Sequence, residues 1–208
     1  MMRARSASIV FIASLLALNA RAEPSYDCAK AMSTAEKEVC RVPDLQWFDR
    51  QLAHLFKLAK DQPGANHDAL VVQQRQFIVR REACRTDFDC LQTAYKSRLA
   101  ELAGQVNVFE VYAEYSPKSF GGSMWIVRDG YHAGVKILTV GGGGHTCAFE
   151  ADNADTTGKG MVKWRGGTGD ACRIDIMPDA EALRVETHNC QDYCGVRAVM
   201  DGTYSHTK

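Results

Sequence analysis

Residues 124–151, MWIVRDGYHAGVKILTVGGGGHTCAFEA, contain three short apolar runs divided by two glycine-containing turns. The runs at 124–128, 135–140 and 146–151 are rich in valine, isoleucine and aromatic residues, which favour β-strands. Glycine supplies the backbone freedom that a tight turn needs between them. This part of the chain is therefore predicted to form an antiparallel sheet.

The same alternation of short apolar runs and turns continues on both sides of this stretch. Eight short strands at this spacing predict a small antiparallel β-barrel or sandwich. The further strands are expected at 106–114, 161–165, 172–177, 183–187 and 196–200.

The chain before this β-rich part has the three- and four-residue spacing of amphipathic helices. Ser33 and Glu36 form a capping box, which predicts the start of a short helix that ends near Cys40. Further helices are expected from 43 to 60, around 70–81 and around 87–102.

The change of pattern predicts an α+β protein with two domains. A disulfide-linked helical hairpin or bundle is expected at 23–104, followed by an all-β domain at 105–208.

Residues 1–22 have the order of a secretory signal peptide. Arg3 and Arg5 precede an apolar run at 7–18, and small residues at 20 and 22 follow it. The run is too short to cross a bilayer as a helix, and the predicted cleavage point after Ala22 has no lipid-accepting cysteine. We therefore expect a periplasmic or secreted protein without stable membrane insertion.

The charge of the expected mature chain argues against one class of partner. Removing residues 1–22 takes away three arginines and no acid, which leaves 22 basic against 25 acidic residues, a net charge of −3. Nucleic-acid binding needs a basic surface that displaces counterions from phosphates, so no nucleic-acid partner is expected. A basic protein partner remains compatible with this charge.

The cysteines predict disulfides, because an even number in an exported chain is typical of an oxidised framework. The bridges are expected to stay within two sets of four. If the helices on either side of Gly64 form a hairpin, positions at similar distances from that turn face each other. This favours the nested pairs Cys28–Cys90 and Cys40–Cys84 over local pairing, whereas the pairing in the second set stays open. The two sets are Cys28, Cys40, Cys84 and Cys90, then Cys147, Cys172, Cys190 and Cys194.

A zinc site is the main alternative to disulfides in the second set. His188, Cys190, Cys194 and Cys172 have residue types and spacing that zinc accepts. An oxidising compartment favours disulfides over thiolate ligands, so we expect neither a metal nor a cofactor.

Residues 141–146, GGGGHT, resemble a phosphate-binding loop but lack the Gly-Lys-Ser/Thr that completes one. They are predicted to form a flexible hairpin turn, whose Gly142, Gly143 and His145 are candidates for contact with a partner. The six histidines have no Ser/His/Asp or HExxH context, so an enzyme is not expected.

The helical part carries a recurring set of motifs: Cys28-Ala29-Lys30-Ala31; Thr34-Ala35-Glu36 before Cys40; Leu45 with Asp49 and Leu52; Gln74, Phe77, Arg81 and Cys84; and Cys90-Leu91 with Tyr95, Arg98, Leu99 and Leu102. On these motifs, residues 28–102 resemble the domain family named after the bacterial lysozyme inhibitor LprI. The resemblance implies a small disulfide-linked helical envelope domain and, for some members, inhibition of lysozyme. It also implies structural roles for Glu36, Asp49, Gln74, Phe77, Arg81, Tyr95 and Arg98.

These features together predict an exported lysozyme-inhibitor-like binder that acts by steric occlusion. The resemblance places the inhibitory contacts in the helical domain, and a loop of the β-domain is the competing location. The alternative function is a periplasmic module that binds or stabilises a glycan or an envelope protein without inhibiting lysozyme.

Overall fold

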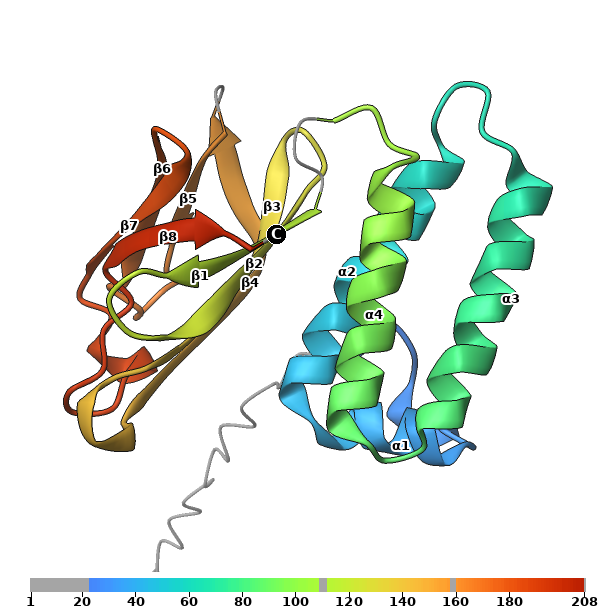
Figure 1. Cartoon of the computed structure of the whole chain (residues 1–208), viewed down its shortest axis with the longest axis horizontal. Helices are drawn as coiled ribbons and strands as arrows, with labels where there is room; N and C mark the ends of the chain where they lie inside the picture. Colours follow the sequence, from blue (N-terminus) through green and yellow to red (C-terminus); the bar gives the residue numbers. More distant parts are fainter. Residues whose placement is uncertain (1–22, 109–111, 158–159, 208) are drawn as a thin grey trace, which may run out of the picture.

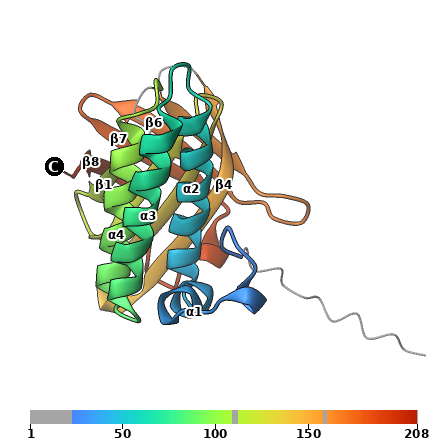
Figure 2. The same ribbon diagram turned by 90° about the vertical axis from the view of Figure 1, so that its right-hand side faces the viewer.

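The structure, a computed structural model, describes residues 23–108, 112–157 and 160–207. The predicted signal peptide and the middle of the predicted strand at 106–114 lie outside the described residues. A layer of helices covers one side of a closed β-barrel (Figures 1 and 2). The predicted α+β class, with helices followed by an antiparallel barrel, is confirmed.

The helices begin where the sequence supplies caps. Ser33 and Glu36 form the predicted capping box, and Asp87 accepts a hydrogen bond from the amide of Cys90. The described helices are η1 (Cys28–Lys30), α1 (Thr34–Arg41), α2 (Pro43–Lys60), α3 (His67–Cys84) and α4 (Phe88–Ala103).

Helix α4 lies between α2 and α3, and both pack against it (Figure 1). The rings of Phe77 on α3 and Tyr95 on α4 meet edge to face at 5.3 Å. Fully buried leucines and aromatics fill the space between the helices, among them Leu55, Leu70 and Leu99. The helical core is therefore built around α4.

The barrel is antiparallel throughout and closes by pairing its first strand with its last. Its strand order follows the sequence, so each strand pairs with the next one along the chain. The strands are β1 (Tyr112–Pro117), β2 (Gly121–Arg128), β3 (His132–Val140), β4 (Thr146–Thr157), β5 (Met161–Arg165), β6 (Arg173–Asp179), β7 (Ala182–His188) and β8 (Gly202–His206), with η2 (Gly142–Gly144) and η3 (Gln191–Tyr193) between them.

Two strand predictions were wrong in position. The last strand is β8 at Gly202–His206, and residues 196–200 are not a strand. The first described strand begins at Tyr112, while Val106 packs into the helical core. Both errors arise because a valine-rich run gains as much from burial against helices or loops as from strand pairing.

The helices and the barrel meet at an apolar interface, because the outer face of β2 belongs to the hydrophobic core of the helices. In β2, Met124 and Ile126 face the barrel interior, while Trp125 and Val127 face outward and join the helical cluster. Phe48 on α2 meets Trp125 edge to face at 5.4 Å. All four β2 residues are at most 4% exposed, so this strand is buried on both of its faces.

Polar contacts fix the position of α2 on the barrel. The ammonium of Lys136 on β3, which is 3% exposed, lies 2.8 Å from Asp44 and 3.1 Å from Glu150. The amide of Gln51 donates to Asp152 at 2.8 Å. A Cβ at Gly134 would lie only 2.0 Å from the Gln51 side chain, so glycine is needed for this close approach.

The helical disulfides are Cys28–Cys40 and Cys84–Cys90, so the nested pairing Cys28–Cys90 and Cys40–Cys84 is wrong. Nested pairing assumed that α2 and α3 lie side by side, but both pack against α4 instead. Cys40 also belongs to α1, which lies across the base of the layer beside η1 (Figure 2). These bridges close loops of 12 and 6 residues, worth about 2–3 kcal/mol each rather than the 4 kcal/mol of a long loop.

The barrel disulfides are Cys147–Cys194 and Cys172–Cys190, which settles the pairing that the sequence left open. All eight cysteines are bonded, and each bridge stays within its set as predicted. The cysteines of the alternative zinc site are therefore disulfides in this structure.

Replacing Trp125 by Ala should destabilise the helices and the barrel together, because this residue of strand β2 is buried in the core of the helices. We expect a loss of about 3–5 kcal/mol in the free energy of unfolding. Denaturant unfolding followed by helical circular dichroism and by tryptophan fluorescence should show one common midpoint. Val79→Ala on the exposed face of α3 is the control, with a change within about 0.5 kcal/mol. Separate transitions for the two signals would contradict the coupling of helices and barrel through β2.

Candidate functional site: the stapled end of the barrel

One end of the barrel is crossed by residues 189–201, an irregular segment between β7 and β8. Two disulfides hold it: Cys194 is bonded to Cys147 on β4, and Cys190 is bonded to Cys172 just before β6. The Gly195 amide also donates to the Thr146 carbonyl at 2.8 Å. The segment is therefore fixed to β4 and to the residue that precedes β6.

The glycine-rich turn between β3 and β4 packs directly against this segment. A Cβ at Gly141 would lie 2.6 Å from the carbonyl oxygen of Arg197, and one at Gly195 would lie 3.3 Å from Nδ1 of His145. Glycine at these two positions lets the two backbones approach each other. The turn and the segment thus form one continuous surface.

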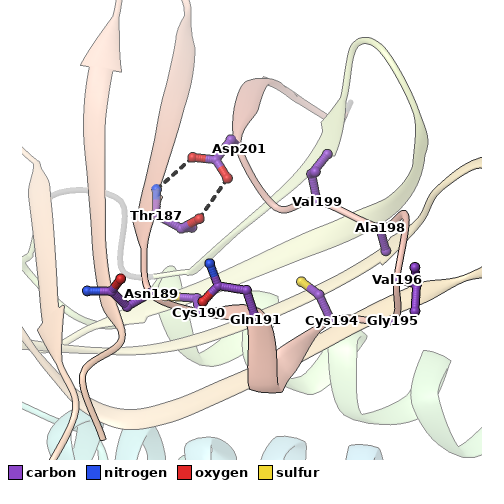
Figure 3. A pocket seen from close by; sticks show the side chains of 10 residues that line it. All are labelled: Thr187, Asn189, Cys190, Gln191, Cys194, Gly195, Val196, Ala198, Val199 and Asp201. Carbon is purple, nitrogen blue, oxygen red and sulfur yellow. Dashed lines mark hydrogen bonds between the residues drawn. The ribbon is translucent and has the colours of Figure 1, made fainter.

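Hydrogen bonds of a buried hydroxyl and of an exposed carboxylate fasten the remaining part of the segment. The hydroxyl of Thr139, which has no exposed surface, donates to the Val199 carbonyl at 2.8 Å. Asp201 accepts from the amide and the hydroxyl of Thr187 at 2.7 and 2.6 Å (Figure 3). Asp201 uses both carboxylate oxygens for this purpose, an arrangement that anchors the segment rather than activating the hydroxyl.

This fastened backbone presents apolar side chains to solvent. Val196 is 90% exposed, Val199 is 50% exposed and Val140, at the end of β3, is 47% exposed. We call residues 140–145 and 189–201 together the barrel-end surface. Such an apolar cluster on a rigid frame is typical of a surface that contacts another molecule.

The barrel-end surface contains a pocket of about 320 Å³. Figure 3 shows Thr187 and Asp201 at one side of the pocket and Val196 and Val199 at another. Side-chain amides add polar groups to the lining at Asn189 and Gln191. The pocket therefore combines apolar side chains with hydrogen-bonding groups.

An aromatic cluster supports the surface from within the barrel. The ring of Phe149 lies 4.9 Å from that of Trp164 and 5.4 Å from that of Tyr193. The Tyr193 hydroxyl donates to Asp170 at 2.6 Å. Burial, together with this hydrogen bond and the charge of Asp170, raises the pKa of Tyr193 to about 12.

The candidate partner residues of the glycine-rich turn lie within this surface. Gly142 and Gly143 belong to η2, and His145 is its C-cap; all three are exposed. Val196 and Val199 are not among the residues predicted from the sequence, because residues 196–200 have the propensity of a strand. The four-residue spacing of Cys190 and Cys194, which favours a tight loop over an extended strand, was the signal that pointed to this segment.

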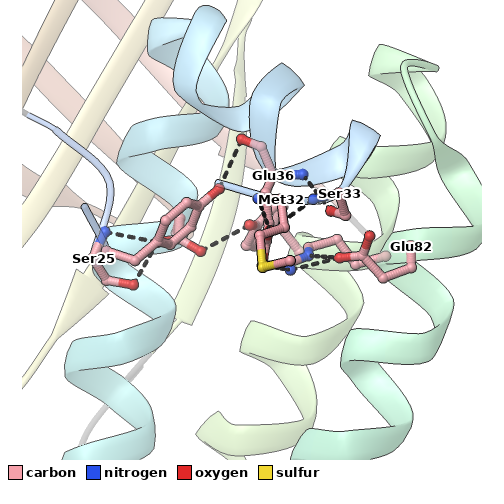
Figure 4. A network of polar contacts seen from close by, with 9 residues as sticks. Ser25, Met32, Ser33, Glu36 and Glu82 are labelled. Atoms are coloured by element: carbon pink, nitrogen blue, oxygen red, sulfur yellow. Dashed lines mark hydrogen bonds and ion pairs between the residues drawn. The ribbon is translucent and has the colours of Figure 1, made fainter. Parts of the chain in front are cut away.

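The residues of the family-like signature lie elsewhere, inside the helical layer. Four of them join one polar network (Figure 4). Asp49 accepts from the hydroxyl of Tyr95 at 2.8 Å and from the amide of Ser25 at 2.8 Å. Arg81, 7% exposed, pairs with Glu82 at 2.6 Å and with Glu36 at 3.4 Å.

Burial and the nearby Asp49 carboxylate raise the pKa of Tyr95 well above its ordinary value. Its hydroxyl is thereby kept as a neutral donor to Asp49. Glu36 of the same network also belongs to the capping box of α1. Hydrogen bonds from the backbone amides of Ser33 and Met32 lower the pKa of its carboxyl group. These contacts connect the N-terminal residues, α1, α2, α3 and α4.

Two other signature residues form a second contact between α3 and α4. Arg98 has no exposed surface, and its Nε donates to Gln74 at 3.1 Å while Nη1 donates to Glu101 at 2.9 Å. Phe77 on α3 also contacts α4, through its ring contact with Tyr95. All seven signature residues therefore hold helices together, and they do not form an exposed contact face.

Comparisons with protein-family models, with curated proteins and with solved structures found no match. The resemblance to the LprI family accordingly stays a prediction. Within residues 23–108, 112–157 and 160–207, no helix has the length and apolar content to span a bilayer. The same residues contain no group of three or more histidine, cysteine, aspartate or glutamate side chains placed to hold a metal ion.

Tyr95→Phe should test the structural role of the signature network. Removing the hydroxyl leaves the buried Asp49 carboxylate with one donor side chain fewer, so we expect a loss of about 1–3 kcal/mol in unfolding free energy. Tyr131→Phe is the matched control, because Tyr131 is 80% exposed. Equal stability of the two variants in denaturant titrations would argue against the network.

Tyr193→Phe should change how stability depends on alkaline pH. The unfolded tyrosine ionises near its ordinary pKa of about 10, whereas the folded one stays neutral up to about 12. Ionisation therefore stabilises the unfolded state, and stability falls as pH rises from about 10 to about 12. Phenylalanine cannot ionise, so the stability of the variant should decrease less over this pH range than that of the unmodified protein. Thermal unfolding at a series of pH values measures the difference. The same decrease of stability with pH in both proteins would contradict the raised pKa.

Proposed function

We propose that this chain is an exported lysozyme-inhibitor-like binding protein, and that it occludes its partner with the barrel-end surface. The observation that carries the proposal is the exposure of Val196 and Val199 on a segment held by two disulfides. A surface fixed before binding loses little conformational entropy when it docks, which favours affinity without covalent chemistry.

The burial of the signature residues shifts the proposed contact from the helices to the barrel. The signature residues are engaged with one another between the helices, so they are not free to meet a partner. The glycine-rich turn, the competing location predicted from the sequence, is exposed and adjoins the valines. We therefore assign the helical layer a supporting role.

Charge and cysteine content support export and a cationic partner. The four disulfides fit an oxidising compartment such as the periplasm or the extracellular space. The net charge of −3 after cleavage at Ala22 would steer the protein toward a cationic lysozyme, mainly by raising the association rate.

The second candidate function is binding of a glycan of the cell envelope. It is favoured by the pocket, where Asn189 and Gln191 supply amide groups beside the apolar side chains. Side-chain amides suit sugar hydroxyls because they both donate and accept hydrogen bonds. On this alternative the same surface binds a small polar ligand and lysozyme is not inhibited.

Lysis of a peptidoglycan suspension by lysozyme should slow when the mature protein is added. The double variant Val196→Asp, Val199→Asp should weaken inhibition by about tenfold or more, because two charges replace apolar contacts at the centre of the surface. The matched control is Val72→Asp, Val79→Asp on α3, which alters two exposed valines and adds the same charge.

The control variant should inhibit like the unmodified protein. Loss of inhibition in the α3 variant alone would show that the helices, and not the barrel-end surface, contact lysozyme. Absence of inhibition by the unmodified protein would overturn the lysozyme proposal, and calorimetric titration with soluble peptidoglycan fragments would then test the glycan alternative.

A further inference from the structure

The disulfide Cys84–Cys90 differs from the other three in its access to solvent. Cys90 is exposed, whereas the other seven cysteines are buried or half-buried. In the barrel, Cys147, Cys172 and Cys190 are at most 5% exposed. All eight cysteines lie in the described part of the chain, and Cys90 is the most exposed cysteine residue among them.

The turn that this disulfide spans also contains a strained residue. Arg85 has a φ of 56° and a ψ of −107°, a conformation that normally requires glycine. The Asp87 amide donates to the Cys84 carbonyl at 3.0 Å and closes the turn around it. Such a backbone persists where the surroundings impose it, and here the disulfide is one of the restraints.

Opening this disulfide removes only a local restraint. It closes a loop of 6 residues, the shortest of the four, and it joins the end of α3 to the start of α4. The capping bond from Cys90 to Asp87 and the contacts of Phe77 and Arg98 between these helices do not depend on it. The helices can therefore keep their arrangement when the sulfurs separate.

We propose that Cys84–Cys90 is a thiol-exchange site, at which a small external thiol forms a mixed disulfide with Cys90 while the other three bridges stay closed. This proposal is independent of the proposed binding function.

In the proposed exchange the external thiol attacks Cys90 rather than Cys84, because Cys84 is 8% exposed whereas Cys90 is the exposed residue of the pair. The external thiolate attacks Sγ of Cys90, the bond between Sγ of Cys90 and Sγ of Cys84 breaks, and its electron pair leaves on Cys84. The Cys84 thiolate then takes a proton from water. The external thiol is oxidised to the mixed disulfide and Cys84 is reduced, so no further oxidant is needed.

The consequence is confined to the helical layer. The strained turn at Arg85 relaxes, and the C-terminal end of α3 and the first turn of α4 become more mobile. Cys147–Cys194 and Cys172–Cys190 continue to hold the barrel-end surface. A reducing environment would thus alter the helical layer and leave the barrel unchanged.

Reduced glutathione added to the native mature protein should reveal the site. After alkylation of free thiols, peptide mass mapping should find glutathione on Cys90 and the alkyl group on Cys84 at roughly a tenth of the glutathione concentration that opens any other bridge. Circular dichroism should remain that of the folded protein at this concentration.

Two variants make the test specific. Arg85→Gly should slow the exchange several-fold, because glycine relieves the strain that opening would release. The double variant Cys84→Ala, Cys90→Ala should incorporate no glutathione over the same range. Modification of Cys28 or Cys40 first, simultaneous opening of all four bridges with loss of the folded signal, or equal rates for Arg85→Gly and the unmodified chain would each overturn the proposal.

Discussion

The apolar outward face of β2 is the constraint on which the rest of this structure depends. Alternate side chains of a barrel strand point inside and outside, so the consecutive apolar residues Met124 to Val127 cannot all enter the barrel. Trp125 and Val127 need a cover, and α2 and α4 provide it. The buried Lys136 beside Asp44 and Glu150 then fixes where the cover lies. The helices and the barrel are consequently held together by the burial of this one strand face.

Local sequence patterns predicted most of the helices and strands. They failed where contacts between distant parts of the chain determine the structure. The capping box at Ser33, the helix after Pro43 and six of the eight strands could be located from spacing, propensity and turn residues. Residues 196–200 have strand propensity but lie in a loop, because disulfides at Cys190 and Cys194 and the carbonyl contact of Val199 hold them in an irregular path. Propensity contains no information about such contacts.

The same limit explains the disulfide error. Nested pairing followed from a two-helix hairpin, and the position of α4 between α2 and α3 is a tertiary fact that the spacing of Cys40 and Cys84 does not encode. A continuous apolar run in β2 did contain a usable signal, because burial on both faces removes the alternation expected of a one-sided sheet. Of the candidate site, the glycine-rich turn could be predicted, whereas the exposed valines beside it could not.

Closure of the barrel has a consequence for the order in which the chain can assemble. The ring closes only when β8 pairs with both β1 and β7, and β8 follows all other strands in the sequence. The helices precede β2 in the sequence and can cover its outer face as soon as this strand forms. The edges of β1 and β7, by contrast, keep unpaired backbone groups until β8 arrives, and such edges invite pairing with other chains. The five residues of Gly202–His206, far along the chain from the helical layer, therefore determine how long a folding molecule exposes unpaired strand edges that favour aggregation.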